Sequence, residues 1–215
     1  MSGDNMLAAL SEGPARLSAG EVSASQRRRM LAAMVAAVAE KGYVATAVAD
    51  VTKRARVSRA TFYEQFEDKN DCFVAAVRAC VDQIVAGVSD RMGREATPQA
   101  ALHRLLQAYL ENLAAFPEGA RVCLVEIYAA GPRAAAQRRQ AQLEFGQMIR
   151  RIHGRMAAAG EPVRDLDDLD IELLIGGVSS LVTNRVAQGA ADTLPDLLDA
   201  VKAFVLANFG LRPEA

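Results

Sequence analysis

The chain has 215 residues, of which 51% are apolar and 5% aromatic, and its formal net charge is −1. Such a chain can bury a sizeable core, and it contains no run of eighteen apolar residues that could span a membrane. Its cysteines, Cys72, Cys80 and Cys123, are odd in number and widely spaced, and there are only two histidines. We therefore expect a globular, cytoplasmic protein without a signal peptide, a disulfide scaffold or a structural zinc site.

Residues 1–24 are rich in Gly, Ser, Ala and Glu and show little apolar periodicity, so we expect a disordered leader. From Ser25 onward, apolar residues recur at helical spacing, and this pattern closes with Lys41 and Gly42. A basic last turn followed by glycine is typical of a helix C-terminus. The sequence therefore predicts that the first helix runs from about Ser25 to Lys41.

Two short helices are predicted next. Thr46 is placed to cap the second helix, in which Val48, Val51 and Ala55 lie on one apolar face. The turn that follows contains Arg56, which must adopt a left-handed backbone conformation or alter the turn. That conformation costs a non-glycine residue about 1 kcal/mol, and the charge of Arg56 could offset this cost by contacting a phosphate.

The third predicted helix lies in the segment RVSRATFYEQF at residues 56–66. Ser58 is an N-cap candidate. Two aromatic residues one turn apart, Phe62 and Phe66, are expected to face inward. Tyr63 then lies on the opposite face, together with the small and basic residues near the start of the helix.

This outward face has the residue types that reading the major groove of DNA requires. Ala60 permits close approach of the backbone and can contact a thymine methyl group, while Arg59 can donate hydrogen bonds to guanine. The hydroxyls of Ser58, Thr61 and Tyr63 can donate to phosphate oxygens. The sequence therefore indicates a helix-turn-helix that binds double-stranded DNA.

Charge is distributed unevenly along the chain. Residues 25–63 contain eight basic and two acidic residues, whereas residues 161–172 contain six acids and one arginine. A compact basic unit at one end of a neutral chain is typical of phosphate binding. The acids fall in the first turn of a predicted helix, where the helix dipole is sufficient to explain them, so no metal site is expected.

The rest of the chain is also predicted to be helical, which makes the fold class all-α. We expect an N-terminal three-helix domain at residues 25–71 that contains the helix-turn-helix, followed by a helical ligand-binding and dimerisation domain at 72–215. Signals in the sequence place the helices of the larger domain at about 68–92, 97–116, 119–130, 132–159, 167–188 and 195–209.

Several residues of this larger domain could line a ligand cavity: Tyr109, Phe116, Cys123, Glu126, Phe145 and Met148. An apolar stripe at helical spacing is more often ordinary core, and the apolar surroundings of Cys123 favour a core cysteine over a redox sensor. Glu126 lies in the most apolar segment, so it is either a ligand-facing carboxylate or half of a buried pair.

The last two predicted helices carry the signal of a subunit interface. Gly176 and Gly177 interrupt an apolar helix at a cost of about 1 kcal/mol each relative to alanine, which indicates the close approach of another backbone. We expect a four-helix interface with a second subunit, formed by Leu173, Gly176, Gly177, Leu181, Val201, Phe204 and Val205.

Residues 27–73 resemble the DNA-binding domain of the TetR family of bacterial transcriptional regulators. The residues that carry the resemblance are EKGY at 40–43, TAVADV from Thr46, RARVSRATFYEQF at 54–66 and DK at 68–69. The resemblance implies a fourth helix that links this domain to a ligand-binding body, and a homodimer. It also implies that Thr46, Ser58, Thr61, Tyr63 and Lys69 contact phosphates while Arg59 and Ala60 face bases.

Two residues depart from the pattern of the family. Arg56 stands where the family usually has glycine in the turn, and Thr52 stands where it often has alanine. The first departure puts the shape of the turn in doubt, and the second the spacing of the two short helices.

We therefore expect a homodimeric repressor that binds a pseudo-palindromic operator and is released by a small, mainly apolar effector, with no cofactor and no membrane association. One alternative is a regulator without a small ligand, switched by a protein partner or constitutively bound. Another is an enzyme that uses Cys123 or Glu126. Against the enzyme, no nucleophile, base and orienting group occur as a recognisable set.

Overall fold

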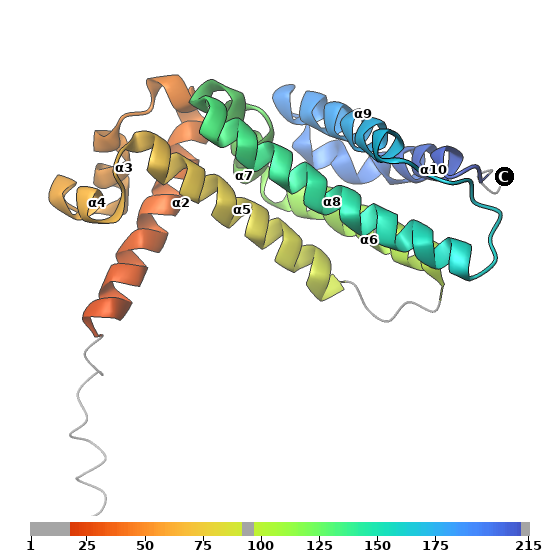
Figure 1. Ribbon diagram of the computed structural model, residues 1–215. Helices are drawn as coiled ribbons and strands as arrows, with labels where there is room; N and C mark the ends of the chain where they lie inside the picture. The colour runs from red at the N-terminus through yellow and green to blue at the C-terminus, as the bar shows by residue number, and fades with distance from the viewer. Residues whose placement is uncertain (1–17, 92–96, 212–215) are drawn as a thin grey trace, which may run out of the picture.

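The computed structural model describes residues 18–91 and 97–211. Their regular structure is entirely helical, so the expected all-α class is confirmed (Figure 1). The elements are α2 (Ala19–Ala45), α3 (Val48–Ala55), α4 (Arg59–Gln65), α5 (Lys69–Arg91), α6 (Pro98–Ala115), α7 (Pro117–Leu124), the 3-10 helix η1 (Glu126–Ala130), α8 (Pro132–Ala158), α9 (Asp168–Ala187), the 3-10 helix η2 (Ala191–Leu197) and α10 (Leu198–Asn208).

The first helix begins earlier than the sequence analysis predicted. It starts at Ala19, within the expected leader, while residues 1–17 of that leader lie outside the described residues. Ser18 caps the helix: its hydroxyl accepts from the Glu21 N–H at 3.2 Å, and the Glu21 carboxylate accepts from the Ser18 N–H at 2.7 Å. This reciprocal capping box satisfies two backbone donors that a helix start would otherwise leave unpaired.

The regular helical conformation of α2 breaks at Gly42, whose φ of 79° is strained for any residue with a side chain. Thr46 then ends the segment rather than capping α3. Its hydroxyl is buried and donates to the carbonyls of Ala37 and Gly42 at 3.3 and 2.8 Å. The N-cap of α3 is Ala47, whose N–H donates to the Asp50 carboxylate at 2.7 Å. The predicted capping by Thr46 is therefore wrong.

One hydrophobic cluster joins the three N-terminal helices to the body, and we call it the N-terminal cluster. It contains the fully buried Met34, Phe62 and Phe73 together with Val122 and Ile127 from α7 and η1. Because this cluster crosses the expected boundary between residues 71 and 72, the three N-terminal helices and part of the body share one core.

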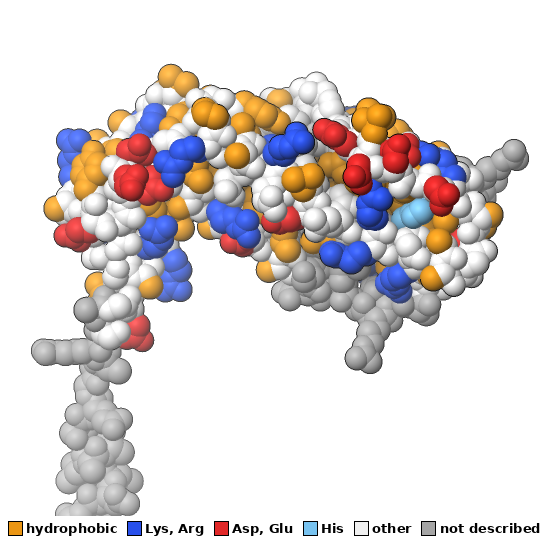
Figure 2. All heavy atoms as spheres, in the orientation of Figure 1, with side chains coloured by type: hydrophobic (Ala, Val, Ile, Leu, Met, Phe, Trp, Pro, Cys, Tyr) orange, Lys and Arg blue, Asp and Glu red, His pale blue; other side chains and the backbone are white. Residues whose placement is uncertain are grey.

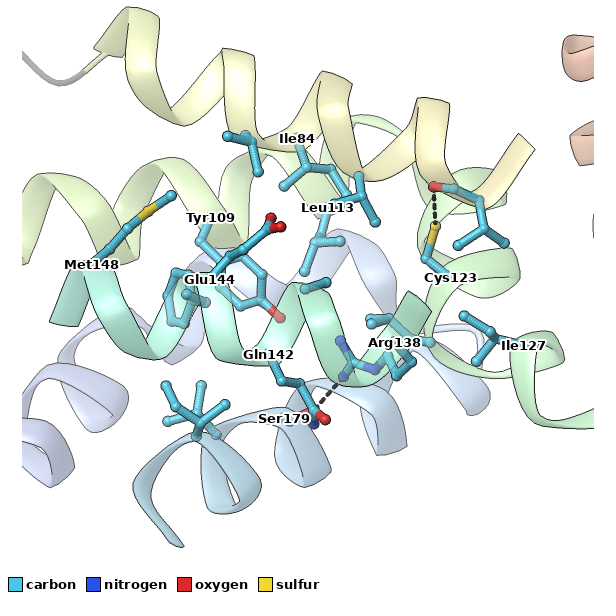
Figure 3. A pocket seen from close by; sticks show the side chains of 18 residues that line it. Ile84, Tyr109, Leu113, Cys123, Ile127, Arg138, Gln142, Glu144, Met148 and Ser179 are labelled. Atoms are coloured by element: carbon cyan, nitrogen blue, oxygen red, sulfur yellow. Dashed lines mark hydrogen bonds between the residues drawn. The ribbon is translucent and has the colours of Figure 1, made fainter. Parts of the chain in front are cut away.

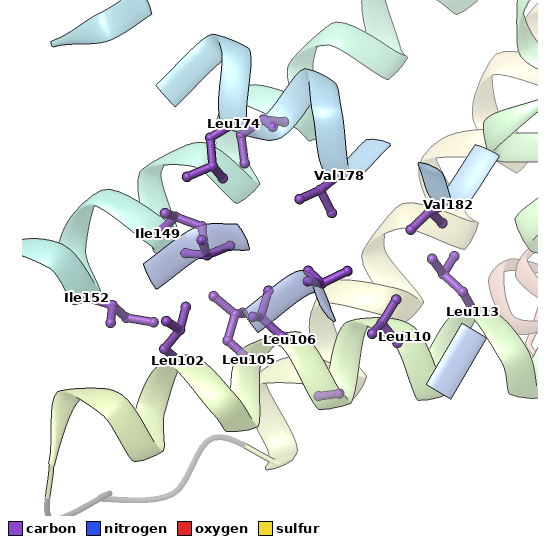
Figure 4. Close-up of a cluster of buried hydrophobic side chains, with 14 of the residues drawn as sticks. Leu102, Leu105, Leu106, Leu110, Leu113, Ile149, Ile152, Leu174, Val178 and Val182 are labelled. Atoms are coloured by element: carbon purple, nitrogen blue, oxygen red, sulfur yellow. The ribbon is translucent and has the colours of Figure 1, made fainter. Parts of the chain in front are cut away.

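The second cluster, the body cluster, fills the space between α6, α8, α9 and α10 (Figure 4). Burying a leucine side chain stabilises a fold by about 1.5–3 kcal/mol, and α6 alone buries several. The residues labelled in Figure 4 are Leu102, Leu105, Leu106, Leu110, Leu113, Ile149, Ile152, Leu174, Val178 and Val182. Ile84 of α5 packs against this cluster, whereas the first turns of α5 belong to the N-terminal cluster, so α5 connects the two.

The later helices follow the predicted signals with two local differences. The Thr97 hydroxyl accepts from the Ala100 N–H at 3.2 Å, and Pro98 occupies the first turn of α6, as predicted. The segment expected at 119–130 is divided into α7 and η1. The final helix begins at Leu198 because the preceding residues form η2, which contains Pro195.

Candidate DNA-binding face and effector cavity

The short helix α4 is held by its cap and by two aromatic side chains. The Ser58 hydroxyl accepts from the Thr61 N–H at 2.9 Å and lies 2.9 Å from the Thr61 hydroxyl. Phe62 and Phe66 are 0% and 2% exposed, and their ring centroids are 5.4 Å apart. The predicted N-cap and the predicted inward face are both observed.

The opposite face of α4 is open to solvent. Arg59 and Ala60 are exposed, and the Tyr63 side chain is 52% exposed. The ring of Tyr63 lies edge-on to Phe62, with 5.4 Å between centroids. This contact steadies the tyrosine while leaving it on the outward face that helical spacing predicted.

Arg56, in the turn between α3 and α4, has the predicted left-handed conformation, with φ 55° and ψ 50°. Its backbone N–H donates to the Lys53 carbonyl at 3.3 Å. It is the one residue other than glycine with a positive φ in the described part of the chain. Its side chain is exposed beside the start of α4, so the turn keeps the shape that a glycine would allow.

Two arginines of α2 act as internal caps. Arg27 donates to the Gln65 carbonyl at 3.0 Å and lies 4.4 Å from the centre of the Phe66 ring. Arg29 donates to the Ala55 carbonyl at 3.0 Å. Both carbonyls are at helix C-termini, where acceptors are unpaired and a positive charge is favourable. These arginines hold α3 and α4 against α2.

Other cations of the basic segment are paired with acids. Lys41 contacts Asp50 at 2.6 Å, and Arg54 pairs with Glu40. Figure 2 shows Lys and Arg side chains both at the end formed by α2–α4 and along the body. Position alone therefore does not identify the cations that are free to contact DNA, and their partners within the protein have to be considered. In the described chain, the exposed cations from α2 to α4 that have neither an acid nor a backbone carbonyl as a partner are Arg28, Lys53, Arg56 and Arg59.

Lys69 is used inside the protein, contrary to its expected place on the phosphate-binding face. Its ammonium donates to the carbonyls of Tyr43 and Thr46, each at 3.0 Å, and lies 4.2 Å from the centre of the Tyr43 ring. Both carbonyls lie at the end of α2, where the regular pattern of helical hydrogen bonds stops. Lys69 and the buried Thr46 therefore stabilise the junction of α2, α3 and α5.

A cavity of about 70 Å³ lies between α5, α6, α7, α8 and α9 (Figure 3). Of the six predicted ligand-binding residues, the four that line it are Tyr109, Cys123, Phe145 and Met148. The rings of Tyr109 and Phe145 pack with 4.8 Å between centroids. Burial raises the pKa of Tyr109, so this residue presents a neutral hydroxyl.

Phe116 and Glu126 lie away from the cavity. The Phe116 ring covers the backbone of Gly119, where an added Cβ atom would lie 2.1 Å from it. The Glu126 carboxylate accepts from the Tyr43 N–H at 3.0 Å and from Arg121 at 3.1 Å, and its side chain is 13% exposed. Of the two interpretations of Glu126, the structure favours the ion pair, which is half-buried rather than buried.

The cavity wall also contains polar residues that the sequence analysis missed. Arg138 and Ser179 are 8% and 9% exposed, and Arg138 donates to the Ser179 hydroxyl. Gln142 donates to the same hydroxyl at 3.2 Å. No sequence signal singles out Arg138, because Arg139 beside it is a solvated arginine of the same helix.

The cysteines are buried thiols. Burial raises the pKa of Cys72 to about 12. A hydrogen bond with Cys80, and then burial, raise the pKa of Cys123 well above its ordinary value. The Cys123 sulfur lies 3.9 Å from the Val77 carbonyl. A raised pKa opposes thiolate formation, so Cys123 is not placed as a nucleophile.

The expected dimer residues fall into two groups. Leu173, Leu181 and Phe204 are 64%, 38% and 44% exposed on α9 and α10. Val201 and Val205, at 2% and 0%, belong to the body cluster. The expectation that these two valines form the interface is wrong, because they lie one turn apart on the core face of α10, whereas the adjacent Phe204 points about 100° away towards solvent.

The two glycines of α9 also differ from each other. An added Cβ atom at Gly177 would lie 3.3 Å from the Phe204 ring, so this glycine lets α10 approach within the subunit. A Cβ atom at Gly176 would meet nothing within 4 Å. Leu169, also on α9, is 60% exposed and was not predicted. The resulting apolar face of α9 and α10 comprises Leu169, Leu173, Gly176, Leu181 and Phe204.

The acidic run before α9 forms caps and ion pairs. The Asp170 carboxylate accepts from Arg164 at 2.7 Å and from the Asp167 N–H at 3.1 Å. The hydrogen bond from Arg164, followed by that from Asp167, lowers the pKa of Asp170. Within residues 18–91 and 97–211, no group of three or more His, Cys, Asp and Glu side chains is arranged to hold a metal ion. None of the described helices is both long and apolar enough to cross a membrane.

Residues 30–76, from α2 to α5, match the family described as bacterial regulatory proteins, tetR family. This segment belongs to the TetR family. Its helix-turn-helix formed by α3 and α4 is the DNA-binding unit of this transcription regulator family.

Solved structures share the fold of most of the chain. The fatty acid degradation regulator FadR from Bacillus halodurans is 21% identical with a TM-score of 0.76, over 87% of this chain and 97% of that one. FadR from Bacillus subtilis, crystallised in complex with stearoyl-CoA, is 20% identical with a TM-score of 0.75, over 84% and 98%. At these identities the likeness shows the fold alone.

A curated relative is similar over part of its length. The transcriptional activator FasR of Mycolicibacterium smegmatis is 25% identical over 112 residues, which is 52% of this chain and 51% of that protein. The match thus spans about half of each chain.

Proposed function

We propose that this TetR-family regulator binds a pseudo-palindromic operator as a homodimer and is released by a small, mainly apolar effector. The observation that carries the DNA-binding part is the division of α4 into two faces. Phe62 and Phe66 anchor the helix in the N-terminal cluster, while Arg59, Ala60 and Tyr63 stay open to solvent. A rigid helix with a small, basic and hydroxylated outer face fits the major groove.

The surroundings of α4 supply candidates for phosphate contacts. Ser58, Thr61 and Tyr63 carry hydroxyls, and Arg56 projects from the turn just before the helix. The exposed cations Arg28 and Lys53 extend this set. Phosphate contacts of this kind fix the position of a protein on the duplex, whereas Arg59 and Ala60 would read bases.

Dimerisation is supported by the apolar face of α9 and α10. Exposed leucine and phenylalanine side chains beside the open backbone of Gly176 would allow helices of two subunits to pack closely. A dimer of helix-turn-helix domains contacts half-sites about 34 Å apart. The two α4 helices would need this separation to bind one operator.

The position of the cavity supports control by an effector. Val77 and Ile127 in its wall belong to the N-terminal cluster, whereas Leu113 and Val178 belong to the body cluster. An effector larger than the 70 Å³ cavity would have to move α5 relative to α8. Because α5 starts directly after α4, this movement would change the separation of the two α4 helices in a dimer and release the operator.

The stearoyl-CoA complex of the Bacillus subtilis relative supports a ligand with a long apolar chain. We favour repression, in which effector binding frees the operator, although FasR is an activator. The enzyme alternative has less support, because Glu126 is engaged with Tyr43 and Arg121 and the pKa of Cys123 is raised.

The experiment that tests this proposal is selection of fragments bound by the purified protein from random and source genomic DNA. Affinity for the enriched site and for a scrambled site is then measured across a salt series. An inverted repeat, two protein chains per site and a steep salt dependence are expected. Equal binding to both sequences, or no binding at low salt, would contradict the proposal.

A reporter assay decides the direction of regulation. The enriched operator is placed downstream of a constitutive promoter and, separately, in its native promoter. Repression predicts higher native expression when the regulator gene is deleted. Lower expression after deletion would identify an activator and would leave operator binding unaffected.

A further inference from the structure

Three polar side chains form a cluster in the mostly apolar wall of the cavity. Arg138 and Gln142 come from α8 and Ser179 comes from α9, and their polar ends meet in Figure 3. Both α8 residues donate to the Ser179 hydroxyl oxygen. The cluster links two helices of the body and faces the space that an effector would occupy.

The cluster has more donors than acceptors. The Nε–H of Arg138 is buried and has no hydrogen-bond acceptor in the described part of the chain. Because the Ser179 oxygen accepts from two side chains, its own proton remains to be donated. The Arg138 Nε–H and the Ser179 hydroxyl are therefore available to donate to a ligand that brings acceptor oxygens.

Arg138 is also a buried charge without an ion-pair partner among residues 18–91 and 97–211. An arginine guanidinium keeps its proton in proteins, and a buried charge is costly unless it is paired. Glu144 lies in the same cavity wall, but it contacts Arg78 at 3.8 Å and accepts from Gln140 at 3.0 Å. In Figure 3 its carboxylate points towards α5, away from Arg138.

We propose that the effector is a carboxylic acid with an apolar body and that Arg138 binds its carboxylate. This inference rests on the proposed effector-responsive function and names the chemistry of the effector. The planar guanidinium can hold both carboxylate oxygens, and the Ser179 hydroxyl can donate to one of them. The apolar body then lies along Val81, Ile84 and Met148, between α5 and α8.

A single negative charge fits this site better than a phosphate does. Arg138 is the only lysine or arginine among the residues that line the described cavity, and the other side chains there are mostly apolar. A phosphate group carries more charge and more oxygens than one guanidinium and one hydroxyl can satisfy. The acid would thus enter as the free carboxylate rather than as a thioester of coenzyme A.

The test measures binding to the full chain by isothermal titration calorimetry in the absence of DNA. The probes are octanoate, laurate and 4-phenylbutyrate, each with its methyl ester, together with lauroyl-CoA. At least one acid is expected to bind about tenfold or more tightly than its ester and than lauroyl-CoA.

The main variant is Arg138→Met, and its matched control is Arg139→Met. Arg139 is the next residue of α8, and its side chain is 71% exposed. Arg138→Met is expected to weaken binding of the acid by about tenfold to a hundredfold and to leave the ester unchanged, because only the acid pairs with the guanidinium. Arg139→Met should change both affinities by less than about twofold.

A second variant, Ser179→Ala, keeps the proposal testable if Arg138→Met does not fold, as judged by thermal unfolding and elution volume. Loss of one hydrogen bond to a charged group should weaken binding of the acid by about tenfold, again without affecting the ester. The proposal is overturned if no acid binds at millimolar concentration, if acid and ester bind equally, or if the thioester binds best.

Operator binding is measured separately, so the two proposals can fail independently. Selective binding of an acid through Arg138 without any operator would support this inference and contradict the DNA-binding function. Release of the operator by esters and acids alike would support the function and overturn this inference.

Discussion

The carboxylate of Glu126 accepts a hydrogen bond from the backbone N–H of Tyr43 at 3.0 Å. Tyr43 follows the break of α2 at Gly42, whereas Glu126 begins η1 in the body. A Cβ atom added at Gly42 would lie 3.2 Å from the same carboxylate. This contact joins the DNA-binding unit to the body through a carboxylate that also pairs with Arg121.

We expect Glu126→Ala to destabilise the protein by about 1–3 kcal/mol, because it leaves a partly buried N–H without its acceptor. Urea unfolding followed by circular dichroism measures this loss. The control is Glu67→Ala, which removes an exposed carboxylate and should change stability by less than about 0.5 kcal/mol. Equal stability of the two variants would show that the contact contributes little.

Tyr63→Phe removes one exposed hydroxyl and leaves the ring on Phe62 in place. If that hydroxyl binds a phosphate, affinity should fall by a similar factor for the operator and for other sequences, as measured by fluorescence anisotropy. Tyr128→Phe is the matched control, since Tyr128 is 61% exposed but lies in η1. A loss confined to the operator would assign Tyr63 to base reading instead.

Arg59→Ala should act differently from the loss of a phosphate contact. Removal of a base contact is expected to cost about 1–3 kcal/mol of operator affinity and to relax the preference at one base position. Repeating the selection of bound fragments with this variant measures both effects. Arg104→Ala on α6, an exposed arginine of the body, serves as its control. An unchanged preference at every position would remove Arg59 from the base-reading face.

Arg56→Gly tests the left-handed turn. Glycine adopts a φ near 55° without strain, so the variant should be more stable by about 0.5–1 kcal/mol in urea unfolding. If Arg56 contacts a phosphate, the dependence of log affinity on log salt should become shallower by about 0.9. A gain in stability with an unchanged salt dependence would leave Arg56 with a structural role only.

If the apolar face of α9 and α10 forms the proposed dimer interface, Phe204→Asp should yield monomers, because it places a charge in that interface. Sedimentation equilibrium measures the mass, and operator affinity should fall together with dimerisation. Tyr128→Asp is the control, as it puts the same charge on an exposed aromatic position outside α9 and α10. A Phe204→Asp protein that remains dimeric would exclude this face as the interface.

The pair between Asp170 and Arg164 predicts a dependence of stability on pH. The hydrogen bond from Arg164 lowers the pKa of Asp170 below its ordinary value of 3.8. The stabilisation is therefore present above pH 3.8 and is lost as the pH falls through the lower folded-state pKa. Asp170→Asn should lower the urea midpoint at pH 7 more than at pH 2. An equal change at both values would contradict the assignment.

Local signals accounted for much of the DNA-binding unit. The cap at Ser58 and the inward position of Phe62 both follow from residue type and helical spacing. The capping box of Ser18 and Glu21 is equally local, but the composition of the first 24 residues favoured a leader, so the predicted helix start at Ser25 was too late.

Contacts between distant segments were harder to predict. Lys69 has the residue type of a phosphate contact, yet its ammonium donates to two backbone carbonyls at the end of α2. Val201 and Val205 have the residue type of an interface, but they face the core of their own subunit. In each case the partner lies on another element, whose position no local pattern specifies.

The sequence by itself determined the helical class, the break at Gly42 and the two faces of α4, because each depends on backbone preferences and spacing within a few residues. Only the tertiary structure decided that Arg138 is buried in a cavity while Arg139 is solvated. Adjacent residues of a helix point about 100° apart, and the surroundings of each direction are set by helices that lie far away along the chain.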